Sequence, residues 1–193
     1  TGSYNFRLNS LNAATAINLE EVVAGTLSPG DSTNAYKFNV TAGERIYFDH
    51  ISRSSTNLWW RLINPFGDEV FGPSRFSTDA GVYTLPYTGI YTLMMEGRYS
   101  QTSPIDYSFQ LNQVVNETSS MTLGETISGV IDMPAQRNYY DVTLTEDTWL
   151  YFDSRLNNSN FYWSLSSPEV GSLVSGRRFD ISDSRDFTST PAM

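Results

Sequence analysis

The chain has 193 residues, a length typical of one or two domains, and it is 39% hydrophobic, 14% aromatic and only 17% charged. Its net charge of -9 argues against binding of nucleic acid or of an anionic membrane surface. With no cysteine and a single histidine, His50, it lacks the residues for disulfides, for cysteine-bound zinc and for most acid–base catalytic sites, so we predict that it is not an enzyme.

Short segments with apolar and polar residues in alternation follow one another along the chain. Their period of two residues predicts β-strands, and Gly, Pro, Asn or Asp residues bound each of them. In chain order the predicted strands include Tyr4–Leu8, Tyr36–Val40, Tyr91–Met95, Tyr107–Leu111 and Asp141–Leu144. No segment carries the apolar stripe of a long helix or the run of apolar residues that spans a membrane. The sequence therefore predicts an all-β protein built from antiparallel β-sandwiches.

The sequence repeats itself at a spacing of about 100 residues. Residues 34–49 match residues 138–153 without a gap at an offset of 104 (153 minus 49). Further along, Asn57–Pro65 matches Asn160–Pro168 at an offset of 103 (168 minus 65). The matches preserve apolar positions, turn residues and spacing, which predicts tandem repeats of one β-sandwich.

The repeat also predicts the domain boundaries. Tyr4–Leu8 matches Tyr107–Leu111 at an offset of 103 (107 minus 4), so residues 1–12 are interpreted as the last strand of a preceding repeat. Residues 13–115 then form a complete repeat, and residues 116–193 form a second repeat that is truncated at its C-terminal side. The truncated part includes the counterparts of Thr88–Gly97 and of the closing strand.

The order of the repeated motifs resembles a known family, the bacterial pre-peptidase C-terminal domains. The motifs that carry the resemblance are Val23–Gly30, Ala35–Asp49, Trp60–Phe71, Thr88–Leu93 and Tyr107–Leu111. More narrowly, the chain is similar to the tandem units of very large secreted or surface proteins, especially of cyanobacteria. The resemblance implies a jelly-roll-like β-sandwich with an extracellular accessory, adhesive or spacer role and no catalysis. Some family members bind calcium through acids near the start of the domain, where this chain offers Glu20 and Glu21.

One acidic position recurs in both repeats, as Asp49 and Asp153, where a strand meets a polar loop. A calcium site there would combine Asp49 with loop oxygens of Ser52, Ser54 or Asn57. The other interpretation is a cap or turn at the end of a strand, since the chain has no Asp-x-Asp-x-Asp-Gly loop. We therefore predict no cofactor, with calcium at Asp49 and Asp153 as the alternative.

Alternation in Asn57–Ile63 divides its side chains between two faces of a strand. The second repeat has apolar residues at the positions of one face only, which marks that face as the core. The core face consists of Leu58, Trp60 and Leu62, with Phe161, Trp163 and Leu165 in the second repeat. The outer face carries Trp59 beside Arg61, and Tyr162 in the second repeat. These residues either bind a sugar ring or a partner, or pack under a loop or a neighbouring repeat.

The hypothesis that follows is a non-catalytic, extracellular structural or adhesive module. Its expected partners are neighbouring copies or repeats of the same protein and cell-surface polysaccharide, without nucleic acid and without insertion into a membrane. Tyr4, Phe6 and Leu8 would form an assembly strand that adds to an open sheet edge of another copy and so builds filaments. The alternative is a carbohydrate- or calcium-binding accessory module of a secreted enzyme.

Overall fold

The computed structural model describes residues 1–4, 6–181 and 184–190, the last of these ranges by its backbone. The chain divides into two compact units. The first unit comprises Thr1–Glu117 and Gly129–Asn138, and the second unit comprises Thr118–Ser128 and Tyr139–Met193. Apart from the 3-10 turn η1 (Leu11–Ala13), all regular elements of the described residues are strands, as predicted. No helix in this part of the chain has the length and apolarity needed to cross a membrane.

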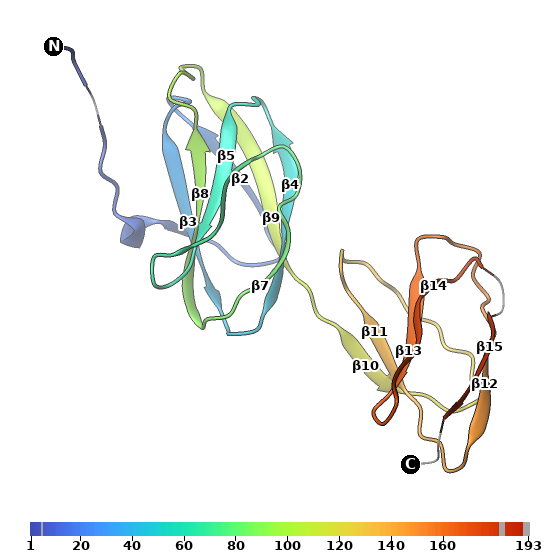
Figure 1. Ribbon diagram of the computed structural model, residues 1–193. Coiled ribbons are helices and arrows are strands. Elements are labelled where there is room, and N and C mark those ends of the chain that lie inside the picture. Colours follow the sequence, from blue (N-terminus) through green and yellow to red (C-terminus); the bar gives the residue numbers. More distant parts are fainter. Residues whose placement is uncertain (5, 182–183, 191–193) are drawn as a thin grey trace. The chain divides into compact units, whose positions relative to one another are not determined.

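Two sheets form the first unit, and most of their strands are labelled in Figure 1. The five-stranded sheet has the order β1 (Thr15–Ala16), β3 (Thr33–Val40), β8 (Gly89–Gly97), β5 (Leu58–Ile63) and β6 (Glu69–Arg75). The four-stranded sheet has the order β2 (Val22–Leu27), β9 (Ile105–Gln113), β4 (Arg45–Arg53) and β7 (Gly81–Thr84). Only the pairing of β1 with β3 is parallel among these ladders. The strands that come last in this unit, β8 and β9, lie in the interior of their sheets.

The core of the first unit lies between these sheets and is rich in aromatic rings. Leu58, Trp60 and Leu62 of β5 are fully buried, while the residues between them are half-buried, which confirms the predicted core face. The Trp60 ring meets Phe76 edge to face at 4.8 Å, and Phe48 of the opposite sheet meets Phe71 at 5.1 Å. Edge-to-face contacts of this kind stabilise a core beyond the area that they bury. The predicted antiparallel sandwich is therefore confirmed in this unit.

A buried hydrogen bond also joins the sheets. The hydroxyls of Tyr36 on β3 and Tyr107 on β9 lie 2.7 Å apart, and the Asn34 side-chain amide donates to the Tyr107 hydroxyl at 2.8 Å. Burial, followed by the bond with Tyr36, raises the pKa of Tyr107, so its phenol stays neutral. Gly25 leaves the room for this pair, because a Cβ at that position would lie 2.5 Å from the Tyr36 hydroxyl.

The remaining described strands pair two by two. The ribbons are β10 (Glu117–Ser120) with β11 (Asn138–Asp141), β12 (Thr148–Phe152) with β15 (Ser184–Thr190), and β13 (Tyr162–Ser167) with β14 (Gly171–Arg178). The pair β13–β14 has the register of β5–β6, displaced by 103 residues. Trp163 lies opposite Arg177 as Trp60 lies opposite Ser74, and Leu165 lies opposite Val174 as Leu62 lies opposite Phe71. The irregularities of the ladder also fall at equivalent residues.

The other two ribbons repeat further details of the first unit. Phe152 of β12 lies opposite Ser184, as Phe48 of β4 lies opposite Gly81 of β7, although the ladder then shifts and Leu150 lies opposite Thr188, two residues beyond the counterpart of Tyr83. The Met121 amide donates to the Asp141 carbonyl at 2.9 Å, as the Ile17 amide donates to the Lys37 carbonyl at 3.0 Å. The ribbons β10–β11, β12–β15 and β13–β14 thus correspond to β1–β3, β4–β7 and β5–β6. The number and bounds of the repeats, with limits at residues 12 and 115, stay predictions.

One predicted strand is wrong over most of its length. Asp141–Leu144 was expected to be a strand, but β11 ends at Asp141 and residues 142–144 have no regular structure. Their counterparts Phe38 and Val40 are held in β3 by pairing with Tyr91 and Gly89 of β8. The described residues of the second unit contain no strand that corresponds to β8, so this segment lacks the partner that would extend it.

The N-terminal segment carries no strand in residues 1–4 and 6–10. Tyr4, Phe6 and Leu8 are 82%, 83% and 92% exposed, and the first two rings stack on each other with their centroids 6.3 Å apart. The predicted strand Tyr4–Leu8 is therefore wrong for the residues that the structure describes, 4 and 6–8, while the interpretation of the segment as part of a preceding repeat stays a prediction.

Candidate functional site

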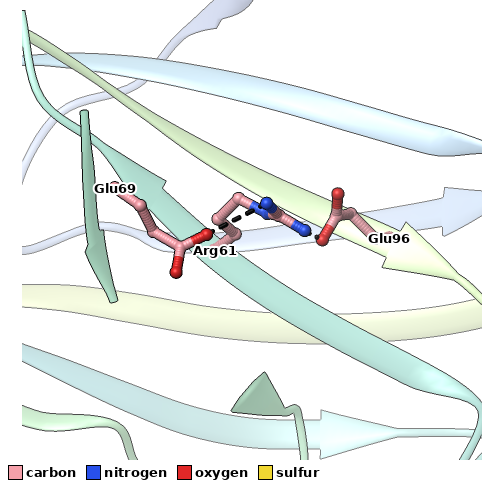
Figure 2. Close-up of polar contacts among 3 residues, drawn as sticks. All are labelled: Arg61, Glu69 and Glu96. Carbon is pink, nitrogen blue, oxygen red and sulfur yellow. Dashed lines mark hydrogen bonds and ion pairs between the residues drawn. The ribbon is translucent and has the colours of Figure 1, made fainter. Parts of the chain in front are cut away.

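The outer face of the five-stranded sheet places Arg61 at the centre of an ion-pair cluster (Figure 2). Its Nη1 lies 2.9 Å from Oε2 of Glu69 on β6, and its Nε lies 3.3 Å from Oε2 of Glu96 on β8. The three side chains are only 24% to 40% exposed. Arg61 thus ties its own strand to both neighbouring strands, and its charge is neutralised within the sheet.

Trp59 lies on the same face as Arg61 and is half-buried. Its neighbours across the ladders are Glu96 on β8 and Arg75 on β6. The guanidinium of Arg75, not that of Arg61, lies over the indole at 5.7 Å from its centroid. This cation–π contact occupies one face of the ring, for which binding of a sugar or a partner was one of the two interpretations. Tyr162, which belongs to the second unit, is 61% exposed and lies opposite Arg178, the counterpart of Arg75.

Asp49 has a second carboxyl group beside it, that of Asp79 from the segment between β6 and β7. The Tyr47 hydroxyl donates to Asp79 Oδ2 at 2.6 Å, and the backbone amide of His50 donates to Asp79 Oδ1 at 3.0 Å. The Tyr47 bond is the largest of the effects that lower the pKa of Asp79. Burial and then the charge of Asp79 raise the pKa of Asp49. The two carboxyl groups therefore differ in environment, and Asp49 is the one that takes up a proton more readily.

The residues that were considered as further calcium ligands make other hydrogen bonds. The Ser52 hydroxyl lies 2.7 Å from the Ser108 hydroxyl, and the Ser54 hydroxyl accepts a hydrogen bond from the Asp106 amide at 2.8 Å. The Asn57 amide group donates to Gln101 Oε1 at 3.0 Å. In the second unit, Asp153 forms an exposed ion pair with Arg155 at 3.3 Å. Calcium at Asp49 and Asp153 stays a prediction.

The acids that the family resemblance suggests, Glu20 and Glu21, each accept a hydrogen bond from the protein itself. Glu20 Oε1 accepts from the Gln113 amide at 2.5 Å, and Glu21 Oε2 accepts from the Asn18 side chain at 3.2 Å. Over the described residues, no group of three or more His, Asp or Glu side chains is arranged so that it could hold a metal ion.

Two exposed aromatic rings form a surface pair that the sequence analysis missed. Phe66 at the tip of the β5–β6 turn and Tyr87 between β7 and β8 meet edge to face at 5.0 Å, and they are 72% and 44% exposed. Ile90, which is 52% exposed, follows in β8. The sequence carried no signal for this pair, because Phe66 and Tyr87 lie in separate turns and their counterparts are Glu169 and Thr190.

No protein-family model and no curated protein matches this chain. Among solved structures it is similar to the pre-peptidase C-terminal domain of a collagenase from Bacillus anthracis, with 20% identity over 56% of this chain and 100% of that one and a TM-score of 0.45. It is also similar to PliG, a periplasmic inhibitor of g-type lysozyme. The Aeromonas hydrophila protein has 14% identity over 52% of this chain and 95% of its own, with a TM-score of 0.40. The Salmonella Typhimurium protein has 17% identity over 51% and 98%, with a TM-score of 0.36. The first of these structures belongs to the family that the sequence resembles.

Proposed function

We propose that this chain is a non-catalytic, extracellular structural module whose copies associate by strand addition into filaments. The observation that carries the proposal is the recurrence of one set of strand registers in β5–β6 and β13–β14. A chain in which one strand arrangement recurs is suited to spacing and assembly, whereas a catalytic or binding cleft needs residues that occur once.

The distribution of repeated residues supports this function. The residues that recur are core aromatics and turn formers, such as Phe48 with Phe152 and Trp60 with Trp163. By contrast, Arg61 has Ser164 as its counterpart, and its ion pairs with Glu69 and Glu96 are made within one sheet. The net charge of -9 keeps such modules soluble and limits contacts other than the specific one.

An extracellular place is part of the proposal and rests on the resemblance of the sequence to domains of secreted and surface proteins. In that setting the partners are other copies of the module, and an adhesive role would use cell-surface polysaccharide.

Light scattering after size exclusion tests the association directly. The full chain is expected to show a mass above 21.7 kDa that rises with concentration, and a chain without residues 1–10 is expected to stay at the mass of one copy. The matched control changes Ser3 and Asn9 to Ala and keeps the apolar residues between them, so it is expected to associate like the unchanged protein. A full chain that remains a single copy at every concentration contradicts the proposal.

A second candidate function is carbohydrate binding, and the exposed pair of Phe66 and Tyr87 favours it. Exposed aromatic rings that project from turns can stack on sugar rings, and this pair is held in place by its own edge-to-face contact. A glycan array should then show binding that Phe66→Ala removes, while Tyr99→Ala, which changes another exposed ring, leaves it intact. Trp59→Ala in the same array tests the binding surface that was considered from the sequence.

Calcium binding is the other form of this alternative, an accessory module that binds a ligand. It is tested by melting curves with and without calcium chloride for the unchanged protein, Asp49→Asn and Asp153→Asn.

A further inference from the structure

The ribbon β12–β15 has an unpaired edge that the corresponding strand of the first unit does not have. β4 lies between β7 and β9, whereas β12 pairs only with β15 in the two-stranded sheet that the structure describes. The inward side chains beside this edge are half-buried. They include Phe152 and Trp163, whose rings stack 3.9 Å apart, and Phe179. This edge therefore offers both backbone hydrogen-bonding groups and apolar surface to a further strand.

The N-terminal segment has the side chains of the strand that would fill this place. Tyr4, Phe6 and Leu8 repeat the inward residues Tyr107, Phe109 and Leu111 of β9 at an offset of 103 (107 minus 4). In β9 these three side chains are at most 2% exposed, because they pack between the sheets. In the N-terminal segment the same types of side chain are 82% to 92% exposed. An apolar pattern of this kind is stabilised when it adds to a sheet.

A polar detail points to the same pairing. On β3, Asn34 donates to the Thr26 carbonyl at 3.1 Å and to the hydroxyl of Tyr107. On β11, Asn138 donates to the Val130 carbonyl at 3.0 Å, which reproduces the first of these two bonds. Tyr140 of β11 is the counterpart of Tyr36, whose hydroxyl lies 2.7 Å from that of Tyr107. β11 thus repeats the two residues that bind the phenol of Tyr107 in the first unit, and Tyr4 is the counterpart of Tyr107.

We propose that residues 4–8 of one copy add antiparallel to the end of β12, at Phe152, and to the residues that follow it in a second copy, in the register that β9 has on β4. That register places Phe48 opposite Leu111, Asp49 opposite Gln110 and His50 opposite Phe109. Transferred to the acceptor, it places Leu8 opposite Phe152, Arg7 opposite Asp153 and Phe6 opposite Ser154. The middle pair joins a basic and an acidic side chain, and an opposite-charge pair stabilises adjacent strands. This inference rests on the proposed function and names the donor, the acceptor edge and their register.

Disulfide trapping between two single-cysteine variants of the full chain tests the register, since the protein has no cysteine of its own. Arg7→Cys is mixed with Asp153→Cys under mild oxidation, with different tags on the two chains so that the mixed dimer is recognised by its mass. Residues directly opposite each other in an antiparallel pair have the Cα separation that a disulfide requires. The mixed dimer is therefore expected in clear excess over that formed by Arg7→Cys with Ser172→Cys, whose cysteine would lie on β14.

The outcomes separate this inference from the proposed function. Association of the full chain on sizing together with equal trapping at positions 153 and 172 would overturn the acceptor edge and leave assembly intact. A full chain that stays a single copy on sizing would overturn both. Trapping that favours position 172 would assign the segment to another strand and would also overturn the inference.

The expected hydrogen bond between the hydroxyls of Tyr4 and Tyr140 allows a second test that does not depend on cysteine. Tyr4→Phe and Tyr140→Phe each remove one hydroxyl, and each is expected to weaken association about fivefold, the worth of one hydrogen bond. The double variant should be little weaker than either single variant, because both changes remove the same bond. Tyr99→Phe removes a hydroxyl of another exposed tyrosine and should leave association unchanged. Additive losses in the double variant would contradict a bond between Tyr4 and Tyr140.

Discussion

Trp60 on β5 and Trp163 on β13 occupy equivalent places in the two units, and each lies opposite the equivalent residue of the next strand. Their surroundings differ. Trp60 is fully buried and touches rings of Phe48, Phe71 and Phe76, whereas Trp163 is half-buried and stacks on Phe152. The strand pair is thus the same in both units while the burial is not.

This difference in burial between Trp60 and Trp163 shows that strand register and side-chain burial depend on different interactions. The length of the turn and the pattern of inward apolar residues determine the register of a hairpin, and both are retained in β13–β14. Burial of the inward residues depends on β8 and β9, which lie in the interior of the two sheets of the first unit. The described residues of the second unit have no strand at these two places, so its inward residues stay half-buried.

The largest expected effect comes from removing the two tryptophans. Trp60→Ala should destabilise the first unit by about 3 to 5 kcal/mol, as for a large aromatic residue deleted from a packed core. Trp163→Ala should cost less than about 2 kcal/mol, because its ring already contacts solvent. Hydrogen–deuterium exchange, read peptide by peptide during a urea titration, measures the two units separately. Equal losses of protection would contradict the difference in burial.

The sequence predicted the features of this comparison that depend on local pattern. Alternation in Asn57–Ile63 identified the core face of β5, and the predicted strands Tyr36–Val40, Tyr91–Met95 and Tyr107–Leu111 lie within β3, β8 and β9. The same reasoning failed at residues 142–144, because the pattern of a strand does not include the partner that holds it.

The sequence could not predict the polar contacts between strands. Asp79 meets Asp49 through a segment 30 residues away (79 minus 49), and Glu96 reaches Arg61 only because β8 lies beside β5. Such contacts depend on strand order and register, which alternation alone does not specify. Trp59 was placed correctly on the outer face, but its contact with Arg75 depends on the β5–β6 pairing.

A smaller effect is expected for the cations on the two units. Arg61→Ala removes two ion pairs from a side chain that is 31% exposed, and we expect a loss of about 1 kcal/mol. Arg155→Ala removes one ion pair from a side chain that is 72% exposed, so almost no change is expected. The midpoint of chemical denaturation measures both, and added salt should reduce the effect of Arg61→Ala. An Arg155→Ala loss as large as that of Arg61→Ala would show that the second unit is more ordered around its charges than its burial indicates.

The smallest expected effect concerns the equivalent acids, Asp49 and Asp153, and it depends on pH. Because burial and Asp79 raise the pKa of Asp49, the folded state binds its proton more tightly than the unfolded state does. The unchanged protein therefore gains stability at this group as pH falls through the raised pKa, and lacks that gain at neutral pH. Asp49→Asn removes the charge, so it should raise the melting temperature of the first unit slightly at neutral pH. The difference from the unchanged protein should become smaller as pH falls and Asp49 of the unchanged protein becomes protonated.

Asp153→Asn is the control. The carboxylate of Asp153 forms an exposed pair with Arg155, so this variant should show no such gain in melting temperature at any pH. Melting curves recorded from about pH 7 to about pH 3 make the comparison, since carboxyl groups titrate within this range. A neutral-pH loss of stability in Asp49→Asn would mean that the ionised carboxylate contributes favourable bonds that outweigh its repulsion by Asp79.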